Sequence, residues 1–218
     1  MEIMPGLHRI SLGKAGQAVN AYLSLDPEPL LVDTGMPGHA SRIVSYMESQ
    51  GLAPEALRHI VLTHHDVDHI GSAPELRRLT GARVYAHRLD APCIAGTEPR
   101  RPWLKRLTSG VLGRVDLAVD ELLEGGETLA GWQVLHTPGH SLGSISLYRP
   151  PVLLVGDLLL SDHGRCREMW RFTMQDAALA RETIRRLAGL DAQVLLTGHG
   201  EPLRGPRLLG GLIASWEA

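Results

Sequence analysis

Five apolar runs in this chain of 218 residues are each followed, within three residues, by a histidine or an aspartate. Short apolar runs bounded by turn residues predict buried strands. One such ending carries no weight, because turns favour aspartate and glycine in any protein. Five of them indicate that one edge of the folded sheets collects imidazole and carboxylate side chains. The residues at these strand ends are Asp33, His64, His140, Asp157 and His199.

The rest of the pattern predicts an α/β protein built as a four-layer αββα sandwich. Strand and helix signals follow one another in the order expected for two sheet-and-helix halves. Thr173, with Asp176 three residues later, is predicted to open the longest helix of the second half. The further strands are predicted at 20–25, 82–86 and 144–148, and the helices at 39–50, 72–79, 175–188 and 207–216.

We expect residues 1–218 to form a single domain, since this length suits one hydrophobic core. Residues 94–117 lack a clear period and are expected to be an inserted loop or lid. The basic residues of this segment either close over a substrate or belong to a solvated loop. They are Arg100, Arg101, Lys105 and Arg106.

Composition limits the classes of partner and the compartment. The net charge of −2 gives no reason to expect a nucleic acid partner. Cys93 and Cys166 form no CxxC pair, and two thiols make no disulfide framework. No apolar stretch approaches the roughly 18 residues of a membrane span, and the first ten residues lack the pattern of a signal peptide. We therefore expect a cytoplasmic protein that acts on a small molecule, and a homodimer stays open.

A concentration of carboxylates and imidazoles at one sheet edge implies a counter-charge. Carboxylates at close range repel one another and lose solvation when buried together, and metal cations reverse that balance. Seven protein ligands suit two divalent metals that share one carboxylate and keep positions open for water and substrate. The histidines and aspartates of the segment 64–69 and of the other strand ends are the residues that could supply such ligands.

The segment Thr63–Gly71, which reads THHDVDHIG, resembles the THxHxDHxG signature of the metallo-β-lactamase superfamily. The other strand-end motifs occur in the family's order and extend the resemblance over nearly the whole chain. These motifs are Val32–Gly35, Pro138–Ser141, Gly156–Asp157 and Gly198–Gly200.

The resemblance implies a role for each candidate ligand. His64, Asp66 and His140 would hold one metal, Asp68, His69 and His199 would hold the other, and Asp157 would bridge the two. A hydroxide held between the metals would be the nucleophile, and Asp68 would also guide the proton, so that Asp68 and Asp157 are the catalytic candidates. Asp33 would support the ligand loop without binding metal.

The chain departs from the signature at Asp66, where the family pattern has histidine. Using His65 instead would give the wrong ligand spacing, so Asp66 is the candidate ligand; flavodiiron members of the family also carry a carboxylate here. An added oxygen ligand shifts the preference of this site toward iron or manganese, although zinc remains the first expectation for the family. A weakened site and a single tightly bound metal are the alternative.

Polar and aromatic residues after the Asp157 strand are candidates for the substrate side. Their guanidinium groups would suit a carboxylate or phosphate on the substrate, and a solvated loop is the alternative. These candidates are Arg165, Arg167, Trp170 and Arg171. Three histidines near the ligands either support the site or are ordinary packing and surface residues, namely His65, His136 and His163.

The function expected from the resemblance is hydrolysis of small-molecule esters, thioesters or lactones. An aspartate at position 157 argues against antibiotic hydrolysis, because true zinc β-lactamases have Cys or Ser there. The slight acidity argues against a nuclease, and the short segment after His199 argues against a glutathione thioester as the substrate. Two alternatives are an iron-dependent redox enzyme, flavodiiron-like or sulfur dioxygenase-like, and a non-enzymatic binding protein.

Overall fold

Two β-sheets packed face to face form the centre of the protein in a computed structural model, which describes residues 1–14, 18–99, 115 and 117–216. The first sheet is antiparallel from β1 to β4 and parallel from β4 to β7. Its strands, in spatial order, are β1 (Glu2–Met4), β2 (Leu7–Leu12), β3 (Val19–Ser24), β4 (Leu30–Val32), β5 (His59–Leu62), β6 (Arg83–His87) and β7 (Glu121–Leu123).

The second sheet is mostly antiparallel, with one parallel pair, β11 and β14. A separate two-stranded hairpin, β12 (Leu159–Asp162) with β13 (Arg165–Glu168), lies between β11 and β14 in the sequence. The strands of the second sheet, in spatial order, are β15 (Leu203–Arg204), β14 (Val194–Leu196), β11 (Val152–Leu154), β10 (Ile145–Arg149), β9 (Trp132–His136) and β8 (Thr128–Leu129).

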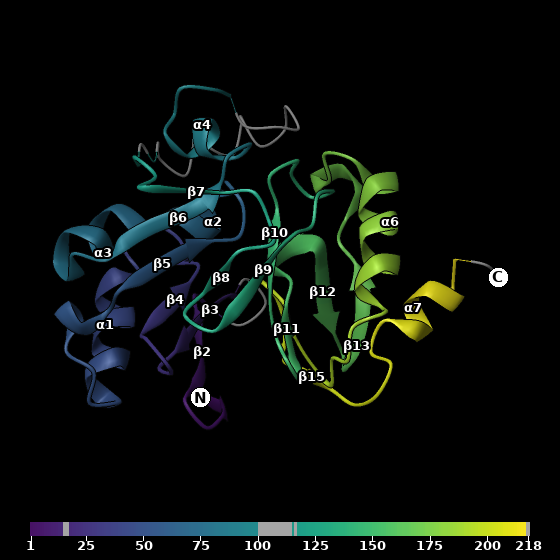
Figure 1. Cartoon of the computed structure of the whole chain (residues 1–218), viewed down its shortest axis with the longest axis horizontal. Coiled ribbons are helices and arrows are strands. Elements are labelled where there is room, and N and C mark those ends of the chain that lie inside the picture. Colours follow the sequence, from purple (N-terminus) through teal and green to yellow (C-terminus); the bar gives the residue numbers. More distant parts are fainter. Residues whose placement is uncertain (15–17, 100–114, 116, 217–218) are drawn as a thin grey trace.

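Helices cover the outer faces of both sheets, which completes the four layers (Figure 1). On the first sheet lie α1 and α3, and on the second lies α6. The helices are α1 (Ala40–Ser49), α2 (Val67–Ile70), α3 (Ala73–Thr80), α4 (Ala91–Ile94), α6 (Ala177–Leu187) and α7 (Gly210–Ala214). The αββα sandwich predicted from the sequence is therefore confirmed.

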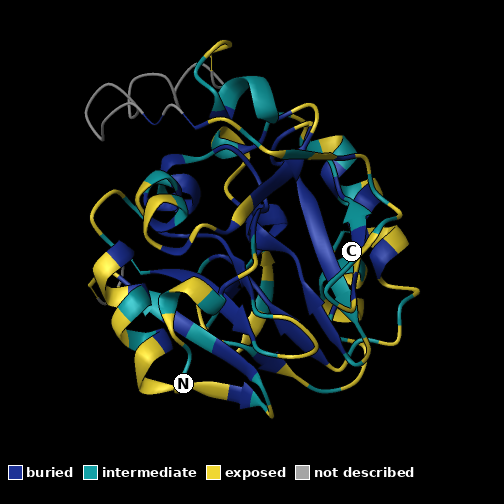
Figure 2. Cartoon of the chain, turned by 60° about the vertical axis from the view of Figure 1, so that its left-hand side comes forward, coloured by how far each residue is buried: buried dark blue, intermediate teal, exposed yellow. Residues whose placement is uncertain are grey.

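The alternation of side chains along the strands explains why both faces of each sheet are covered. Within β5, Ile60 and Leu62 pack in the cluster that contains α1, whereas Val61 packs between the two sheets. In the second sheet Leu153 packs with α6, and Leu154 faces the first sheet. Because successive side chains point to opposite faces, strands that are apolar at every position need cover on both sides. Figure 2 shows these strands as the buried interior.

The pairing of parallel strands places the site residues at one edge. Val32 pairs with Val61 across β4 and β5. Asp33, directly after β4, and Thr63, directly after β5, therefore lie side by side. Leu154 pairs with Leu196 across β11 and β14, which brings the segments after both strands to the same edge of the second sheet. This edge collects the side chains that the five strand ends predicted.

Several element boundaries differ from those predicted. The helix predicted at 175–188 begins after Asp176, whose carboxylate accepts hydrogen bonds from the backbone N–H groups of Ala178 and Leu179. The prediction that Thr173 opens it was wrong, because its hydroxyl donates to the carbonyl of Trp170 instead. The last helix is shorter than the predicted 207–216.

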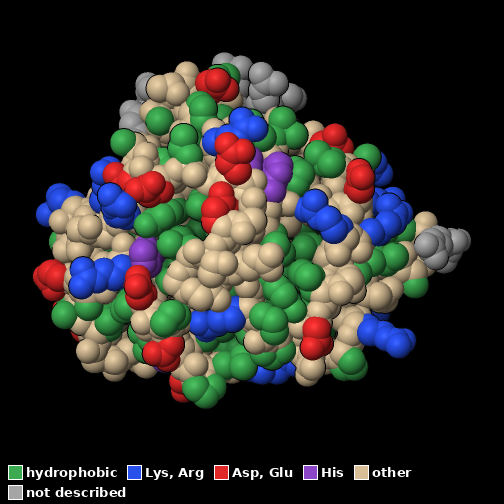
Figure 3. Space-filling model, in the orientation of Figure 1, with side chains coloured by type: hydrophobic (Ala, Val, Ile, Leu, Met, Phe, Trp, Pro, Cys, Tyr) green, Lys and Arg blue, Asp and Glu red, His purple; other side chains and the backbone are tan. Residues whose placement is uncertain are grey.

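The proposed insert at 94–117 lies mostly outside the described residues, and so do its four basic residues at 100, 101, 105 and 106. Val115 and Leu117 are buried in the same apolar cluster as Ile94. Among the helices of the described residues, none is long and apolar enough to cross a bilayer. On the face drawn in Figure 3, acidic and basic side chains are interspersed.

Candidate metal centre

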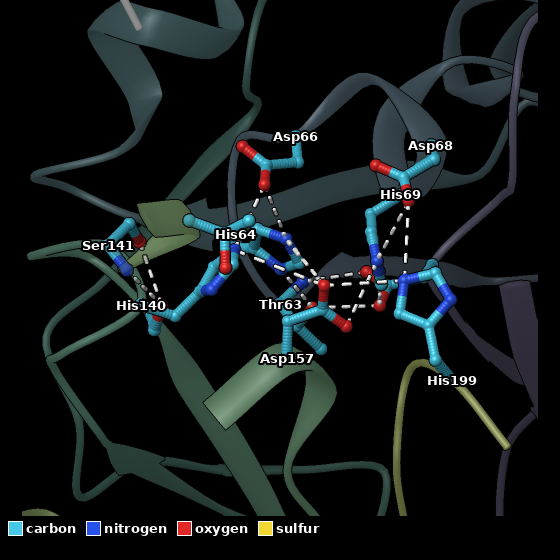
Figure 4. A network of polar contacts seen from close by, with 12 residues as sticks. Thr63, His64, Asp66, Asp68, His69, His140, Ser141, Asp157 and His199 are labelled. Carbon is cyan, nitrogen blue, oxygen red and sulfur yellow. Dashed lines mark hydrogen bonds and ion pairs between the residues drawn. The ribbon is translucent and has the colours of Figure 1, made fainter. Parts of the chain in front are cut away.

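The seven candidate ligands meet in one cluster, although they come from four separate segments (Figure 4). His64 lies two residues after the end of β5, and Asp66 precedes α2, which carries Asp68 and His69. His140 lies between β9 and β10, Asp157 lies in the 3₁₀ turn after β11, and His199 follows β14. The sequence prediction that distant strand ends converge is thus matched by the geometry.

His64, Asp66 and His140 form what we call the first ligand group. Oδ2 of Asp66 lies 2.9 Å from Nε2 of His140 and 3.5 Å from Nε2 of His64. Both imidazoles are 1 % exposed. Two atoms bound at about 2.1 Å to one tetrahedral ion lie about 3.4 Å apart, so these separations fit a shared cation.

Asp68, His69 and His199 form the second ligand group. Oδ2 of Asp68 lies 3.4 Å from Nε2 of His199 and 3.8 Å from Nε2 of His69. Asp68 and His199 are about one third exposed, at 35 % and 30 % of their side chains, whereas His69 is fully buried. The second group is therefore the half of the centre that opens to solvent.

Asp157 lies between the two ligand groups. One of its carboxylate oxygens is 3.3 Å from Nε2 of His69, and the other is 3.4 Å from Nε2 of His199. The second oxygen also lies 4.0 Å from Nε2 of both His64 and His140. This central placement is what a carboxylate shared by two metals requires.

The charges of the cluster favour bound cations. Burial opposes a charge on Asp157, but His199 and His69 outweigh it and hold the pKa of this carboxyl well below its usual value. Burial likewise opposes a charge on His199, but Asp157 and Asp68 raise the pKa of its imidazole to about 10. The carboxylates thus hold positive charge beside them, and divalent cations would supply the same charge with better geometry.

Three of the imidazoles present Nε2 to the cluster because Nδ1 is anchored elsewhere. Nδ1 of His69 donates to Oδ2 of Asp33 at 2.8 Å, and Nδ1 of His199 donates to the carbonyl of Ala18 at 3.1 Å. The hydroxyl of Thr63 donates to Asp33, so it accepts from Nδ1 of His64 at 2.9 Å. In the neutral form that binds a metal, each of these imidazoles would carry its proton on Nδ1 and its lone pair on Nε2.

A buried ring nitrogen without a hydrogen bond also indicates a metal site. Nε2 of His64 is buried and makes no hydrogen bond with the described residues. An unsatisfied buried nitrogen costs about 1–3 kcal/mol, and a bound cation would remove that cost. The donor set of nitrogens and carboxylate oxygens therefore fits a divalent metal.

Asp33 occupies the supporting position that the resemblance implied. Its carboxylate accepts three hydrogen bonds, from the backbone N–H and hydroxyl of Thr63 and from His69. Its backbone φ of 58° lies in the left-handed region, which aspartate tolerates better than most residues. Asp33 does not belong to any ligand group.

A second supporting carboxylate, Asp90, is a residue that the sequence reasoning missed. One oxygen accepts from Nδ1 of His65 at 2.9 Å and from the hydroxyl of Ser141 at 2.7 Å, and the other accepts from the backbone N–H of Gly143 at 3.0 Å. Asp90 thereby ties the loop of His64 and Asp66 to the loop of His140. His65 supports the site and lies in no ligand group.

Gly198 makes close contact with the cluster. A Cβ on this residue would overlap the carboxylate of Asp157 and would lie 2.6 Å from Cε1 of His69. The glycine that precedes His199 in the sequence motif is thus required by space at the centre.

The remaining candidates divide between the site and its surroundings. Arg167 and Trp170 line a cleft that also contains His199. Arg165 lines a separate cavity beside α7, and Arg171 lies in the 3₁₀ turn after Trp170. The imidazole of His163 is 91 % exposed, and His136 stacks on His87 with ring centroids 4.1 Å apart.

Comparison with known proteins assigns the family. The family model of the metallo-beta-lactamase superfamily matches residues 16–199. The chain belongs to this superfamily. The resemblance seen in the sequence motifs is confirmed, and with it the class of metallo-hydrolases.

Individual relatives agree with this assignment. The chain is 31 % identical to the probable metallo-hydrolase YflN of Bacillus subtilis (strain 168), over 94 % of this chain and 87 % of YflN. It is 34 % identical to the hydroxyacylglutathione hydrolase of Idiomarina loihiensis over 70 % of this chain, and the match spans only 51 % of that enzyme. A crystal structure of TTHA1623 in a di-iron-bound form is similar with a TM-score of 0.74 and 27 % identity, over 95 % of this chain and 96 % of that one.

Proposed function

We propose that this protein hydrolyses small-molecule esters, thioesters or lactones with the help of two divalent metal ions. The observation that carries the proposal is the set of anchored imidazoles whose Nε2 atoms surround the carboxylate of Asp157. The proposed ligands are His64, Asp66, Asp68, His69, His140, Asp157 and His199.

When bound, divalent cations at this centre would polarise a carbonyl and lower the pKa of water from about 15.7 toward about 7. The chain's own residues hold the arrangement in place. Asp33 fixes the orientation of His69 directly and that of His64 through Thr63. Asp157 lies between the two ligand groups, with one oxygen 3.3 Å from Nε2 of His69 and the other 4.0 Å from Nε2 of His64.

Asp68 is the proposed proton carrier. Its carboxylate is 35 % exposed, whereas Asp157 is 6 % exposed. Oδ2 of Asp68 also faces His199 at the open side of the cluster. A carboxylate that reaches solvent from inside the site is placed to take a proton from water and return one to a leaving group.

Metal content and substrate turnover test the proposal together. Purified, reconstituted protein should contain about two equivalents of metal by elemental analysis, as seven ligands that include one shared carboxylate suggest. It should also hydrolyse members of an ester, thioester and lactone panel. His64→Ala should abolish turnover and lower the metal content. His163→Ala is the matched control, because that imidazole is 91 % exposed. Full turnover after complete removal of metal would overturn the proposal.

An iron-dependent redox reaction is the second candidate. It is favoured by the carboxylate oxygen of Asp66, which lies within 3.5 Å of two ligand nitrogens in the first group, and by the di-iron-bound form of TTHA1623. Oxygen ligands shift metal preference toward iron and manganese. Iron in the isolated protein, oxygen-dependent turnover and no hydrolysis would favour this reaction. Failure to bind metal on reconstitution would favour a non-enzymatic binding protein.

A further inference from the structure

A cleft of about 990 Å³ opens beside His199 and so leads into the second ligand group. Its walls come from the β12–β13 hairpin, the segment after it, the loop after β14 and the start of β3. Part of the wall is apolar or aromatic. These residues are Leu160, Met169, Trp170 and Leu212.

The acidic residues of the cleft are already paired with arginines. The three carboxylates lining the cleft each have one arginine partner within 3 Å, and Arg167 is the single arginine among the described lining residues. The pairs are Asp162 with Arg167 at 2.9 Å, Glu168 with Arg181 at 2.7 and 2.9 Å, and Glu201 with Arg9 at 2.7 Å.

The charge balance has a consequence for the substrate. A negatively charged group that entered the cleft would meet these carboxylates, and it would find Arg167, Arg9 and Arg181 already paired with them. Burying such a group without a partner is unfavourable. The cleft is therefore better suited to an uncharged part of a substrate than to an anionic one.

Trp170 supplies the largest uncovered apolar surface of this cleft. Its side chain is 60 % exposed, and its ring stacks on the ring of Phe172, which is 62 % exposed, with centroids 6.1 Å apart and planes within 11°. Large aromatic rings gain free energy when they are covered. A substrate whose carbonyl reaches His199 would run along this wall, since both residues line the same cleft.

We propose that this cleft binds an uncharged acyl chain or ring of the substrate against Trp170, and that Trp170 determines specificity. The inference rests on the proposed hydrolysis and narrows its substrate class. It favours neutral esters and lactones with an apolar group over thioesters whose carrier bears carboxylates.

A matched pair of esters tests the charge selectivity. With the metal-loaded protein, kcat/KM should be at least about tenfold higher for 4-nitrophenyl pentanoate than for the 4-nitrophenyl monoester of glutaric acid, which has a similar chain length and a terminal carboxylate. Glu201→Gln removes the negative charge that neutralises Arg9 and should reduce the preference for the neutral ester. Equal values for the two esters would overturn the proposed selectivity.

Trp170→Ala tests the subsite itself. It should lower kcat/KM for the pentanoate by about tenfold and for 4-nitrophenyl acetate by much less, because only the longer chain reaches the ring. Trp170→Phe should restore most of the loss. The melting temperature should not change, as the side chain is 60 % exposed. A change of oligomeric state with no change in either ester would instead assign the ring to an interface between copies.

A binding measurement separates this inference from the proposed hydrolysis. Saturation-transfer NMR with the neutral ketone 4-phenylbutan-2-one should detect binding to the metal-loaded protein and lose the signal in Trp170→Ala. Absence of hydrolysis together with this binding would refute the reaction and leave the apolar subsite standing. If the ketone does not bind, or binds Trp170→Ala equally well, the proposed subsite is wrong, independently of the ester kinetics.

Discussion

At the scale of single residues, Asp33 and Asp90 hold the two sides of the candidate metal centre from outside it. Asp33 lies against His69 and Thr63, and Asp90 joins His65 to Ser141. Supporting partners of this kind orient ligands and typically change metal affinity by about 10- to 100-fold when they are lost. Because Asp33 and Asp90 contact different ligand loops, substitutions at the two positions should weaken metal binding on different sides of the candidate centre.

We expect Asp90→Asn to weaken the first ligand group selectively. Asparagine has one acceptor oxygen, whereas Asp90 accepts three hydrogen bonds through two oxygens. The loops of Asp66 and His140 would then lose their common anchor, and metal content should fall from about two equivalents toward about one. Elemental analysis after dialysis measures this. Asp191→Asn, an exposed position, is the control, and two retained equivalents would show that Asp90 does not position the first group.

Cys166 should be chemically inert in the folded protein. Burial raises the pKa of its thiol to about 12, so that at pH 8 only about one molecule in ten thousand carries the reactive thiolate. In the Cys93→Ser background, maleimide labelling at pH 8 should be slow when the protein is folded and rapid in denaturant. The rate should increase steadily as pH rises toward 12. Rapid labelling of the folded protein at pH 8 would contradict the burial of this thiol.

The residues of the centre could be predicted from sequence, but their supports only in part. Several candidate ligands follow apolar strands, so the parallel pairing of Leu154 with Leu196 brings Asp157 and His199 to the same edge. Asp90 precedes Ala91 and Pro92, a position that normally indicates a helix N-cap. The structure has no such capping bond, because the carboxylate turns toward His65 and Ser141. His65 and Ser141 lie 25 and 51 residues from Asp90 in the sequence. No local sequence pattern could therefore predict that Asp90 contacts them.

At the scale of elements, the helix ends show where local patterns mislead. The spacing of Thr173 and Asp176 matches a capping box, but Asp176 itself accepts from two backbone N–H groups and opens α6. The end of β11 is a second example. The apolar run that begins at Val152 continues to Val155, but the strand ends at Leu154 and a 3₁₀ turn carries Asp157 inward. Residue type alone does not say which of two adjacent polar groups reaches the free N–H groups.

The cap of α6 gives a direct test of this correction. Asp176→Ala should lower the free energy of unfolding by about 1 kcal/mol, since two backbone N–H groups lose their acceptor. Thr173→Ala should cost clearly less, because that hydroxyl bonds within its own turn. Urea unfolding of both variants compares them. An equal or larger loss of unfolding free energy in Thr173→Ala would indicate that Thr173, not Asp176, caps the helix.

At the scale of the whole molecule, the interface between the sheets joins the two halves of the sequence. Val61 from the first half and Leu154 from the second lie in one buried cluster. The ring of Trp132 also belongs to it, and its indole N–H donates to the hydroxyl of Ser24 at 3.2 Å. Each sheet covers the apolar inner face of the other in this cluster, so we expect each half to need the other to remain folded.

We therefore expect residues 1–218 to unfold as one cooperative unit, as a single domain does. Leu154→Ala should destabilise the metal-free protein by about 2–5 kcal/mol, the usual cost of removing a buried leucine side chain. Far-UV circular dichroism and tryptophan fluorescence should move to the same lower denaturant midpoint, because both halves lose the shared contact. Ile184→Ala, in α6 on the outer face of the second sheet, should shift both signals together as well. Two separate transitions, with only the second half responding to Leu154→Ala, would mean that the halves are independent domains.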